Sequence, residues 1–402
     1  MAELLTRARR EGVQGASRRL ARRVTRRLDL SALDFPLLSA DIADSTRLTQ
    51  PPLVQRRHAP DRLTIGWLTT PPGAGSGGHT TIFRMVRALE QAGHQCVLYL
   101  YDRHQGSLQR QERVIRAHWP WVQAEVADAE QLPGDLDAYV ATSWPTAHVL
   151  ATRAPSAGHR FYFVQDYEPF FYARGSEYAL AEDTYRFGFT HIALGEMVAA
   201  CLRAEVGAPS VTVPFGCDAA VYTRTNLGPR RGVVLYAKPT VERRGFRLAQ
   251  LALQELHRRH PQEPIHLYGE HVPDLGFPAV LHHRLTPPQL NELYNQVRAG
   301  LAMSFTNISL VAEEMLASGV VPVVNDSCYS RADLPHPSAR FAPATPGGLA
   351  DALSEIIDHG DAGQQSARAA ACVRAGGWGP AGRGVTAIIE QQVYRPCSPA
   401  PR

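Results

Sequence analysis

Short apolar runs alternate with amphipathic stretches along most of the chain after residue 60. Runs of this kind, bounded by Gly, Pro and polar residues, are typical of strands that are buried on both faces of a parallel sheet. In the first half of the chain they predict strands at 63–68, 96–101, 138–142, 160–164 and 191–194. Apolar residues at helical spacing predict helices at 80–91 and 196–205. The order of strand, helix and strand indicates right-handed crossovers within one sheet.

A second series of the same units begins near residue 231. It predicts strands at 232–236, 265–268, 299–303 and 320–324, and helices at 246–260, 287–297 and 310–318. Gly319 stands directly after the last of these helices, at a position where a left-handed residue commonly ends a helix. We therefore expect two successive α/β domains, at 58–222 and 223–380, followed by a final segment at 381–402.

The chain length and the cysteines narrow the class of protein. A length of 402 residues suits two domains. No apolar run approaches the roughly 18 residues that a membrane span needs, and the arginine-rich start is unlike a secretory signal. The six cysteines form no CxxC pair, which argues against zinc ribbons and redox motifs and fits a reducing compartment. We expect a cytoplasmic protein.

Basic residues are concentrated at the N-terminus. Residues 1–30 carry a net charge of +6 and the other residues carry −2, so that the near-neutral body argues against nucleic-acid binding. Apolar residues between arginine pairs predict a helix at 1–30 that either contacts the inner face of an anionic membrane or docks on the protein itself. A mitochondrial transit peptide has a similar composition. Residues 31–60, with four prolines, are expected to be an irregular linker, so that this extension reaches residue 57.

A glycine-rich loop at 73–78 leads into the first predicted helix, with Gly77, Gly78 and His79 at the junction. Glycines let a backbone approach a ligand closely, and a helix N-terminus attracts anions. The loop is neither a Walker A motif nor a strict GxGxxG motif. A tight turn without any ligand explains it equally well.

The segment at 304–310 joins a strand to a helix in the second domain. Asn307 and Ser309 can cap this helix, and the amides of Ser309 and Leu310 could then hold a diphosphate. Glu314, about one turn further on, could accept hydrogen bonds from ribose hydroxyls. The alternative is an exposed amphipathic helix with two solvated glutamates, Glu313 and Glu314.

Three cations, Lys238, Arg243 and Arg244, follow the first strand of the second domain. In open parallel sheets, ligands bind at the carboxyl ends of the strands. Cations at this edge could neutralise a departing nucleotide diphosphate and thereby stabilise the transition state. A solvated basic loop is the alternative.

Carboxylates and aromatic rings stand together after the strand at 160–164. Asp166 and Glu168 alternate with Tyr167 and precede further aromatic residues at 170–172. Rings pack on the C–H faces of sugars and carboxylates bind hydroxyl groups, so that both acids are candidates for the general base. An aromatic core cluster with carboxylates at its rim is the alternative.

Other patterns carry less weight. Asp135-Leu136-Asp137 has the spacing of metal-dependent transferases, but it follows Pro-Gly and leads into a strand, so that a turn explains it better. The histidines include no HExxH motif and no zinc spacing, and there is no GxSxG motif. We therefore expect no metal site.

Several of these segments resemble family 4 GT-B glycosyltransferases. Gly77-Gly78-His79 at the start of a helix resembles the beginning of their N-terminal domain, and the stretch 307–319 resembles their donor-site signature. Residues 78–84, 162–169 and 236–239 look like bacterial rhamnosyltransferases that use dTDP-L-rhamnose. The resemblance covers about residues 60–395.

The resemblance implies a GT-B fold, in which two Rossmann-like domains face each other across a cleft and a helix near 385–393 returns to the first domain. It implies metal-independent transfer with retention of configuration, and no cofactor besides the nucleotide-sugar substrate. The first domain would bind a carbohydrate acceptor and the second the donor. Family roles carry over to Glu314 for the ribose, to the Ser309–Leu310 amides for the diphosphate, and to Lys238 with Arg243 or Arg244 as diphosphate cations.

One position departs from the family pattern, which has two glutamates separated by seven residues. Counted back from Glu314, the earlier glutamate falls at Thr306, which carries no acid. This loss is compatible with a deoxysugar donor such as L-rhamnose and also with weak or absent catalysis. Three hypotheses stay open: a rhamnosyltransferase of bacterial surface glycans, a GT-B transferase that uses a UDP- or GDP-sugar, and a non-catalytic sugar-binding or scaffold protein.

Overall fold

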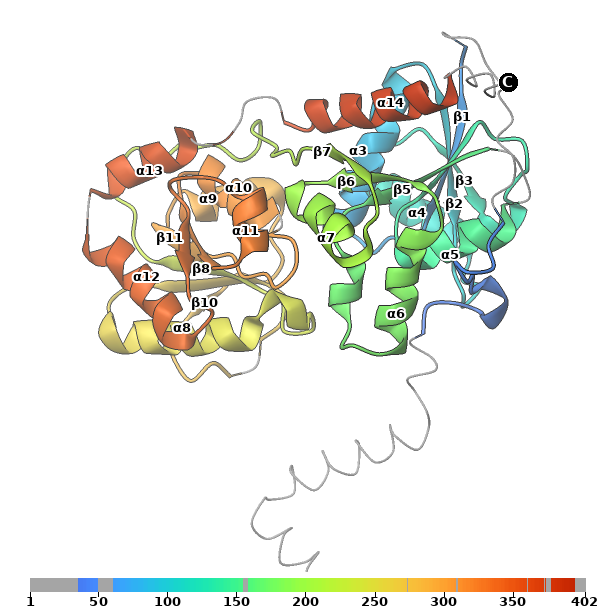
Figure 1. Ribbon diagram of the computed structural model, residues 1–402. Helices are drawn as coiled ribbons and strands as arrows, with labels where there is room; N and C mark the ends of the chain where they lie inside the picture. Colours follow the sequence, from blue (N-terminus) through green and yellow to red (C-terminus); the bar gives the residue numbers. More distant parts are fainter. Residues whose placement is uncertain are drawn as a thin grey trace, which may run out of the picture.

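The computed structural model describes residues 35–49, 61–154, 158–272, 274–308, 310–359, 361–371, 373 and 377–394. These residues form two α/β domains that lie side by side, each built on a parallel sheet (Figure 1). The predicted helix at 1–30 lies outside the described residues. No helix in the described part of the chain is both long and apolar enough to cross a bilayer.

The first domain contains a seven-stranded parallel sheet in the order β3-β2-β1-β4-β5-β6-β7. Its strands are β1 (Thr64–Thr69), β2 (Gln95–Leu100), β3 (Glu125–Asp128), β4 (Ala138–Ala141), β5 (His159–Val164), β6 (Thr190–Leu194) and β7 (Ser210–Val213). Its helices are α3 (Gly77–Gln91), α4 (Leu108–His118), α5 (Trp144–Arg153), α6 (Ser176–Asp183) and α7 (Glu196–Val206). The sequence did not predict β3 and β7, because these edge strands are short and only partly buried.

The second domain contains a six-stranded parallel sheet in the order β10-β9-β8-β11-β12-β13. Its strands are β8 (Val233–Ala237), β9 (Ile265–Gly269), β10 (Val280–Leu281), β11 (Ala299–Leu301), β12 (Val321–Asn325) and β13 (Arg340–Ala342). Its helices are α8 (Phe246–Arg259), α9 (Pro287–Tyr294), α10 (Leu310–Ala317), α11 (Cys328–Asp333), α12 (Pro346–Asp358) and α13 (Ala362–Ala371). Gly319 has a φ of 81°, the left-handed conformation expected after α10.

Helices cover both faces of each sheet, and the central strands are buried almost completely. In β1, the side chains of Ile65, Trp67 and Leu68 are 0% exposed. The ring of Trp67 meets that of Phe163 on β5 edge to face, with 6.2 Å between their centroids. Burial of one such large apolar side chain contributes roughly 1.5–3 kcal/mol to stability. The near-continuous apolar runs of the sequence therefore reflect strands that are covered on two sides.

The C-terminal helix α14 (Gly379–Val393) returns from the second domain and lies along α3 of the first (Figure 1). The two helices pack closely, since a Cβ on Gly382 would come within 2.6 Å of the Ala88 side chain. This return was predicted. The helix begins at Gly379, earlier than expected, because its first turns contain three glycines and carry little apolar signal.

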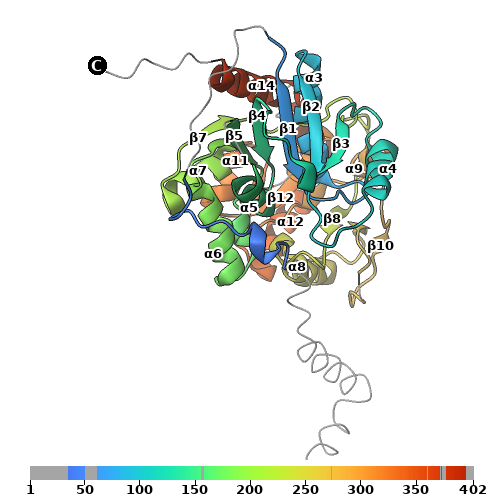
Figure 2. The ribbon, with the colours of Figure 1, turned by 90° about the vertical axis from the view of Figure 1, so that its right-hand side faces the viewer.

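The described part of the predicted linker is mostly irregular, as expected, and it packs on the first domain. Leu37 and Ala43 belong to the first domain's core, on either side of a short turn, η1 (Ser39–Asp41). Asp41 accepts hydrogen bonds from Arg153 Nε at 2.7 Å and from the Tyr101 hydroxyl at 2.8 Å. Figure 2 shows this segment, in dark blue, beside α5 and α6. A buried ion pair and two apolar anchors thus fix this mostly irregular segment to the first domain, which the sequence did not predict.

Candidate functional site

The order of strands along the sheet reverses at one point in each domain, between β1 and β4 and between β8 and β11. Ligands of open parallel sheets bind beside the carboxyl ends of the strands at such points. The loops that follow β1, β5, β8 and β11 hold most of the predicted site residues. The site is therefore built from loops of both domains.

The N-terminus of α3 stands after β1 at the first of these points. Gly77, Gly78 and His79 form the first turn of α3, whereas the sequence placed the two glycines in the preceding loop. His79 Nδ1 lies 2.9 Å from Ser76 Oγ, and its Nε2 lies 2.9 Å from the carbonyl oxygen of Thr70. Burial lowers the pKa of His79, so that the imidazole is held neutral and fixed at this helix end.

Asp166, after β5, makes a direct connection to the second domain. Its Oδ2 accepts a hydrogen bond from Thr306 Oγ1 at 2.8 Å, and its Oδ1 accepts one from the Asn307 amide at 3.2 Å. Arg243 Nη1 lies 3.4 Å from Oδ2, and Asn307 Nδ2 donates to the Gln165 carbonyl at 2.8 Å. Burial raises the pKa of Asp166, while Arg243 opposes the rise. The loop after β5 and the loop after β11 therefore meet around one buried carboxyl group.

The guanidinium groups of Arg243 and Arg244 lie beside the loop that leads into α10. Arg243 lies over the ring of Phe171, 4.2 Å from its centroid. Arg244 Nη1 donates hydrogen bonds to Ser304 Oγ at 2.9 Å and to the Asn307 carbonyl at 3.2 Å. Burial, together with Arg243, lowers the pKa of Arg244 to about 10, which still leaves it protonated at neutral pH. Positive charge is thus concentrated where a helix N-terminus also favours anions.

Lys238 stands at the carboxyl end of β8, as the sequence indicated, but it is paired. Its Nζ donates to Glu270 Oε1 at 3.0 Å and lies 5.7 Å from the centre of the Tyr236 ring. Burial opposes its charge, yet Tyr236 and Glu270 outweigh burial and raise its pKa. The cation is present at the expected edge, with its charge balanced by an acid that follows β9.

Solved structures of other proteins share this arrangement of domains. A glycosyltransferase from Rickettsia africae is 11% identical, with a TM-score of 0.61 over 84% of this chain and 100% of its own. Anabaena HepE, solved with UDP and glucose, is 14% identical, with a TM-score of 0.61 over 83% of this chain and 98% of its own. The chain has the GT-B fold. A putative UDP-N-acetylglucosamine 2-epimerase from Listeria monocytogenes, 11% identical with a TM-score of 0.55 over 83% of this chain and 97% of its own, is also similar.

Two family models match within the GT-B domains. The model of the WsaF N-terminal domain matches residues 130–196, and that of the WsaF C-terminal domain matches residues 231–354. The O-antigen biosynthesis protein RfbC of Myxococcus xanthus is 31% identical over 363 residues, which make up 82% of this chain and 27% of that protein. The chain thus spans about a quarter of the length of this relative. Together with the solved structures, these matches support a glycosyltransferase of the GT-B fold.

The start of α10 differs from the predicted cap of a GT-B donor site. The side chain of Asn307 donates to Gln165 in the first domain, and its Oδ1 has no hydrogen-bond partner among the described residues. Ser309 lies outside the described residues, and Leu310 is the first residue of the helix. The proposed grip of the Ser309 and Leu310 amides on a diphosphate stays a prediction.

Glu314 is not the solvated glutamate of the alternative interpretation. Burial raises its pKa to about 8, Asp218 adds to this rise, and Arg84 on α3 opposes it. Tyr222 also interacts with this carboxyl group through a hydrogen bond. Glu314 thus lies where α10 meets α3 of the first domain and the segment 214–232 that joins the two domains. Its contact with a ribose stays a prediction.

Glu168 lies within the first domain's core instead of at the rim of the cleft. Its Oε2 accepts a hydrogen bond from the Trp144 amide at 2.8 Å, and its Oε1 accepts one from the Tyr162 hydroxyl at 3.2 Å. The residue is 6% exposed, and burial raises its pKa to about 8. The carboxyl group caps the start of α5, so that the geometry favours a structural role over that of a general base.

The sequence missed the partners of two predicted site residues. Glu270 directly follows β9, and the rule that selected Lys238, a charged residue after a strand, would also have selected it. Arg84 is on the polar side of a predicted helix, and no local signal indicates its proximity to Asp218 and Glu314. Glu270 could therefore have been predicted from the sequence, whereas the position of Arg84 is known only from the folded structure.

Proposed function

We propose that the chain transfers a sugar from a nucleotide-sugar donor to a carbohydrate acceptor during the assembly of a bacterial polysaccharide such as an O antigen. The observation that carries this proposal is the pair Arg243 and Arg244 beside the start of α10, at a switch point that faces the first domain. A diphosphate is the ligand that such a cluster of guanidinium groups fits best. The WsaF matches and the O-antigen protein of Myxococcus xanthus support a polysaccharide acceptor.

In this mechanism the second domain stabilises the leaving group. Arg243 and Arg244 would balance the charge that develops on the nucleotide diphosphate as the glycosidic bond breaks. No metal ion is assigned to this step, and configuration is retained as the resemblance implies. Enclosure between the domains would position the reactants and exclude water.

Asp166 has a place in this mechanism. It brings a carboxyl group within 2.8 Å of Thr306 Oγ1, at the position where the resemblance leads one to expect a glutamate. A diphosphate would compete with Asp166 for Arg243. Donor binding would then leave Thr306 as the one remaining partner of Asp166 Oδ2 among these groups, so that a second lone pair of this oxygen could face an acceptor hydroxyl. This makes Asp166 a better candidate than Glu168 for the general base.

The favoured donor is dTDP-L-rhamnose, because of the resemblance at 78–84, 162–169 and 236–239 and because Thr306 replaces an acid. HepE, which was solved with UDP and glucose, supports a UDP-sugar as the alternative donor. The Listeria epimerase shows that the fold alone does not separate transfer from epimerisation. The two reactions differ in their products: transfer releases the nucleotide, whereas epimerisation retains a nucleotide sugar.

Nucleotide binding tests the donor site. We expect dTDP at saturating concentration to raise the melting temperature more than UDP or GDP, because a ligand at about 100 times its Kd stabilises the folded state by roughly 2.7 kcal/mol. Arg243→Gln should lose most of this rise, whereas Arg110→Gln, an exposed arginine of α4, should keep it. A larger response to UDP would reassign the donor. No response to any of the three nucleotides would contradict the proposal.

A further inference from the structure

A groove of about 880 Å³ lies between α3 and α14. It is lined by the later turns of α3, by Trp121 after α4, by Asp218 and Val221 of the segment 214–232 that joins the two domains, and by α14 as far as Glu390. The N-terminal turn of α3, with Gly77 and His79, does not line it. None of the residues assigned to the donor lines the groove, and Arg84 and Asp218 in its wall lie between it and Glu314.

Two tryptophans form part of the wall of this groove. Arg87 lies over the ring of Trp121, 5.6 Å from its centroid, and Arg84 lies over the ring of Trp378 at 4.7 Å. Trp121 is half-buried, so that part of its ring is open to the groove. A partly exposed indole ring beside polar groups is suited to the C–H face of a sugar and can donate a hydrogen bond from its N–H group.

The charges in the groove are unbalanced in favour of cations. Asp218 is paired with Arg84, and Glu390 lies 3.0 Å from His94 Nε2, so that both acids of the groove already have partners. Arg87 and Arg383 are exposed, and no acid of the described residues lies within ion-pair distance of either, although Glu90 on α3 interacts electrostatically with Arg87. Two guanidinium groups thus remain available to an anionic ligand.

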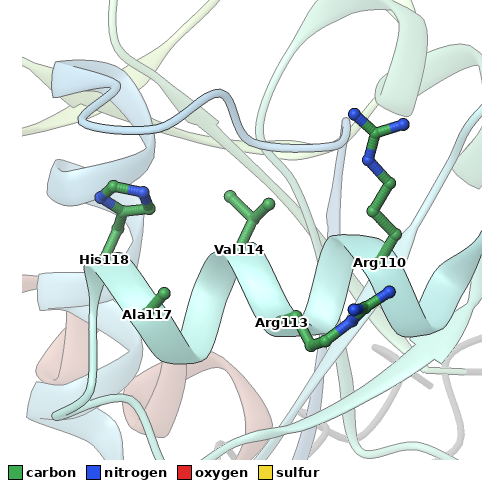
Figure 3. A pocket seen from close by; sticks show the side chains of 5 residues that line it. All are labelled: Arg110, Arg113, Val114, Ala117 and His118. Atoms are coloured by element: carbon green, nitrogen blue, oxygen red, sulfur yellow. The ribbon is translucent and has the colours of Figure 1, made fainter.

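A second, smaller pocket is also basic but lacks the tryptophan walls of the groove. It has a volume of about 320 Å³, and its lining side chains, including Arg110, Arg113 and His118, all project from α4 (Figure 3). Arg110 and Arg113 are exposed like the groove arginines, but no tryptophan lines this pocket. These two residues match the charge of Arg87 and Arg383 without the built walls, and they provide a control.

We propose that the groove between α3 and α14 binds an acidic saccharide, outside the donor cleft. The ring of Trp121 would pack on one sugar, and Arg87 and Arg383 would hold carboxylate or phosphate groups through charge-assisted hydrogen bonds. The proposal goes beyond sugar transfer, because binding of an acidic saccharide in this groove does not depend on which nucleotide sugar the donor site binds. It gives the protein a means to hold an anionic glycan beside the domain that is expected to receive the acceptor.

Calorimetric titration with trigalacturonate, and with maltotriose as the neutral saccharide, tests the groove. We expect trigalacturonate to bind the full chain about tenfold more tightly than maltotriose, with an affinity that falls as salt rises. The double variant Arg87→Gln/Arg383→Gln should lose about tenfold in affinity, and Arg110→Gln/Arg113→Gln should lose little. The response to dTDP should persist in both variants, which separates this test from that of the donor site.

Three outcomes would overturn the proposal. In the first outcome, the full chain binds no trigalacturonate. In the second, the two double variants lose affinity equally, which would indicate an unspecific effect of charge. In the third outcome, phosphatidylglycerol vesicles bind the full chain and lose binding selectively in Arg87→Gln/Arg383→Gln, while trigalacturonate does not. That result would assign the groove to a membrane surface.

Discussion

Glu168 and Glu314 are two carboxyl groups whose burial raises their pKa values to about 8. The amide of Trp144 and the hydroxyl of Tyr162 satisfy Glu168 within one domain. Glu314 faces an arginine of the other domain, and Asp218 adds to the rise of its pKa. The same chemical group thus supports the core in one place and the domain boundary in the other.

The pH dependence of stability tests the assignment of Glu168. The folded protein holds the Glu168 proton up to about pH 8, whereas a glutamate in the unfolded chain releases it near its usual pKa of about 4.3. Its contribution to stability therefore falls as pH rises through this window, by at most about 1.4 kcal/mol per unit. Glu168→Gln carries no titrating proton, so that its melting temperature should rise relative to wild type between about pH 5 and about pH 8.5.

Thermal melts of both proteins across this range provide the measurement. Glu112→Gln, at an exposed ion pair of α4, serves as the control and should leave the difference between variant and wild type independent of pH. Parallel profiles for wild type and Glu168→Gln would show that Glu168 keeps its charge in the folded protein.

For single residues, the sequence predicted which loop a side chain belongs to better than whether that side chain faces the other domain or the core. Asp166 and Arg243 were selected because they follow strands, and the structure brings them within 3.4 Å. Glu168 follows the same strand, but a 3-10 turn directs it into the core. Direction depends on such local turns, and no apolar periodicity marks them.

At the scale of elements, the loop after β5 and the loop before α10 hold the two domains together. Asp166→Ala would leave Thr306 Oγ1, the Asn307 amide and Arg243 without this acceptor. An unsatisfied buried donor costs about 1–3 kcal/mol. We expect a lower melting temperature and a larger radius of gyration in small-angle X-ray scattering, because the Asp166 carboxyl group joins the first domain to the second.

Asp183 offers a matched control for this variant. It accepts hydrogen bonds from the Ser45 amide at 3.0 Å and from Ser45 Oγ at 2.6 Å, both within the first domain. Asp183→Ala should lower the melting temperature and leave the radius of gyration unchanged. An unchanged radius in Asp166→Ala as well would contradict the role of Asp166 between the domains.

Element prediction succeeded where burial on both faces leaves an apolar run, as in β1, β5 and β12. It failed for β3 and β7, where an edge position removes most of that signal. The irregular structure of residues 35–49 was predicted, but their packing on the first domain was not, because the anchors Leu37 and Ala43 are too few to form a pattern. The hydrogen-bond partners of Asp41, which are Arg153 and Tyr101, are distant in sequence.

At the scale of the whole molecule, two parallel sheets present their switch points to a shared boundary. The repeated strand–helix units predicted two α/β domains, and the family resemblance predicted the GT-B architecture and the returning helix. The contacts across the boundary were not predicted. Asp166 and Thr306 are 140 residues apart, and only the folded arrangement brings a first-domain carboxyl group to the place of the missing glutamate.

The most direct test of sugar transfer is the release of nucleotide from dTDP-L-rhamnose, UDP-glucose and a GDP-sugar, each with the full chain and with Arg243→Gln. We predict dTDP release that increases when a polysaccharide acceptor is added, and a loss of about a hundredfold or more in Arg243→Gln, the typical cost of removing one group that stabilises developing charge. A folded protein that binds nucleotides but releases none from any donor, or that returns an epimerised nucleotide sugar, would contradict this account.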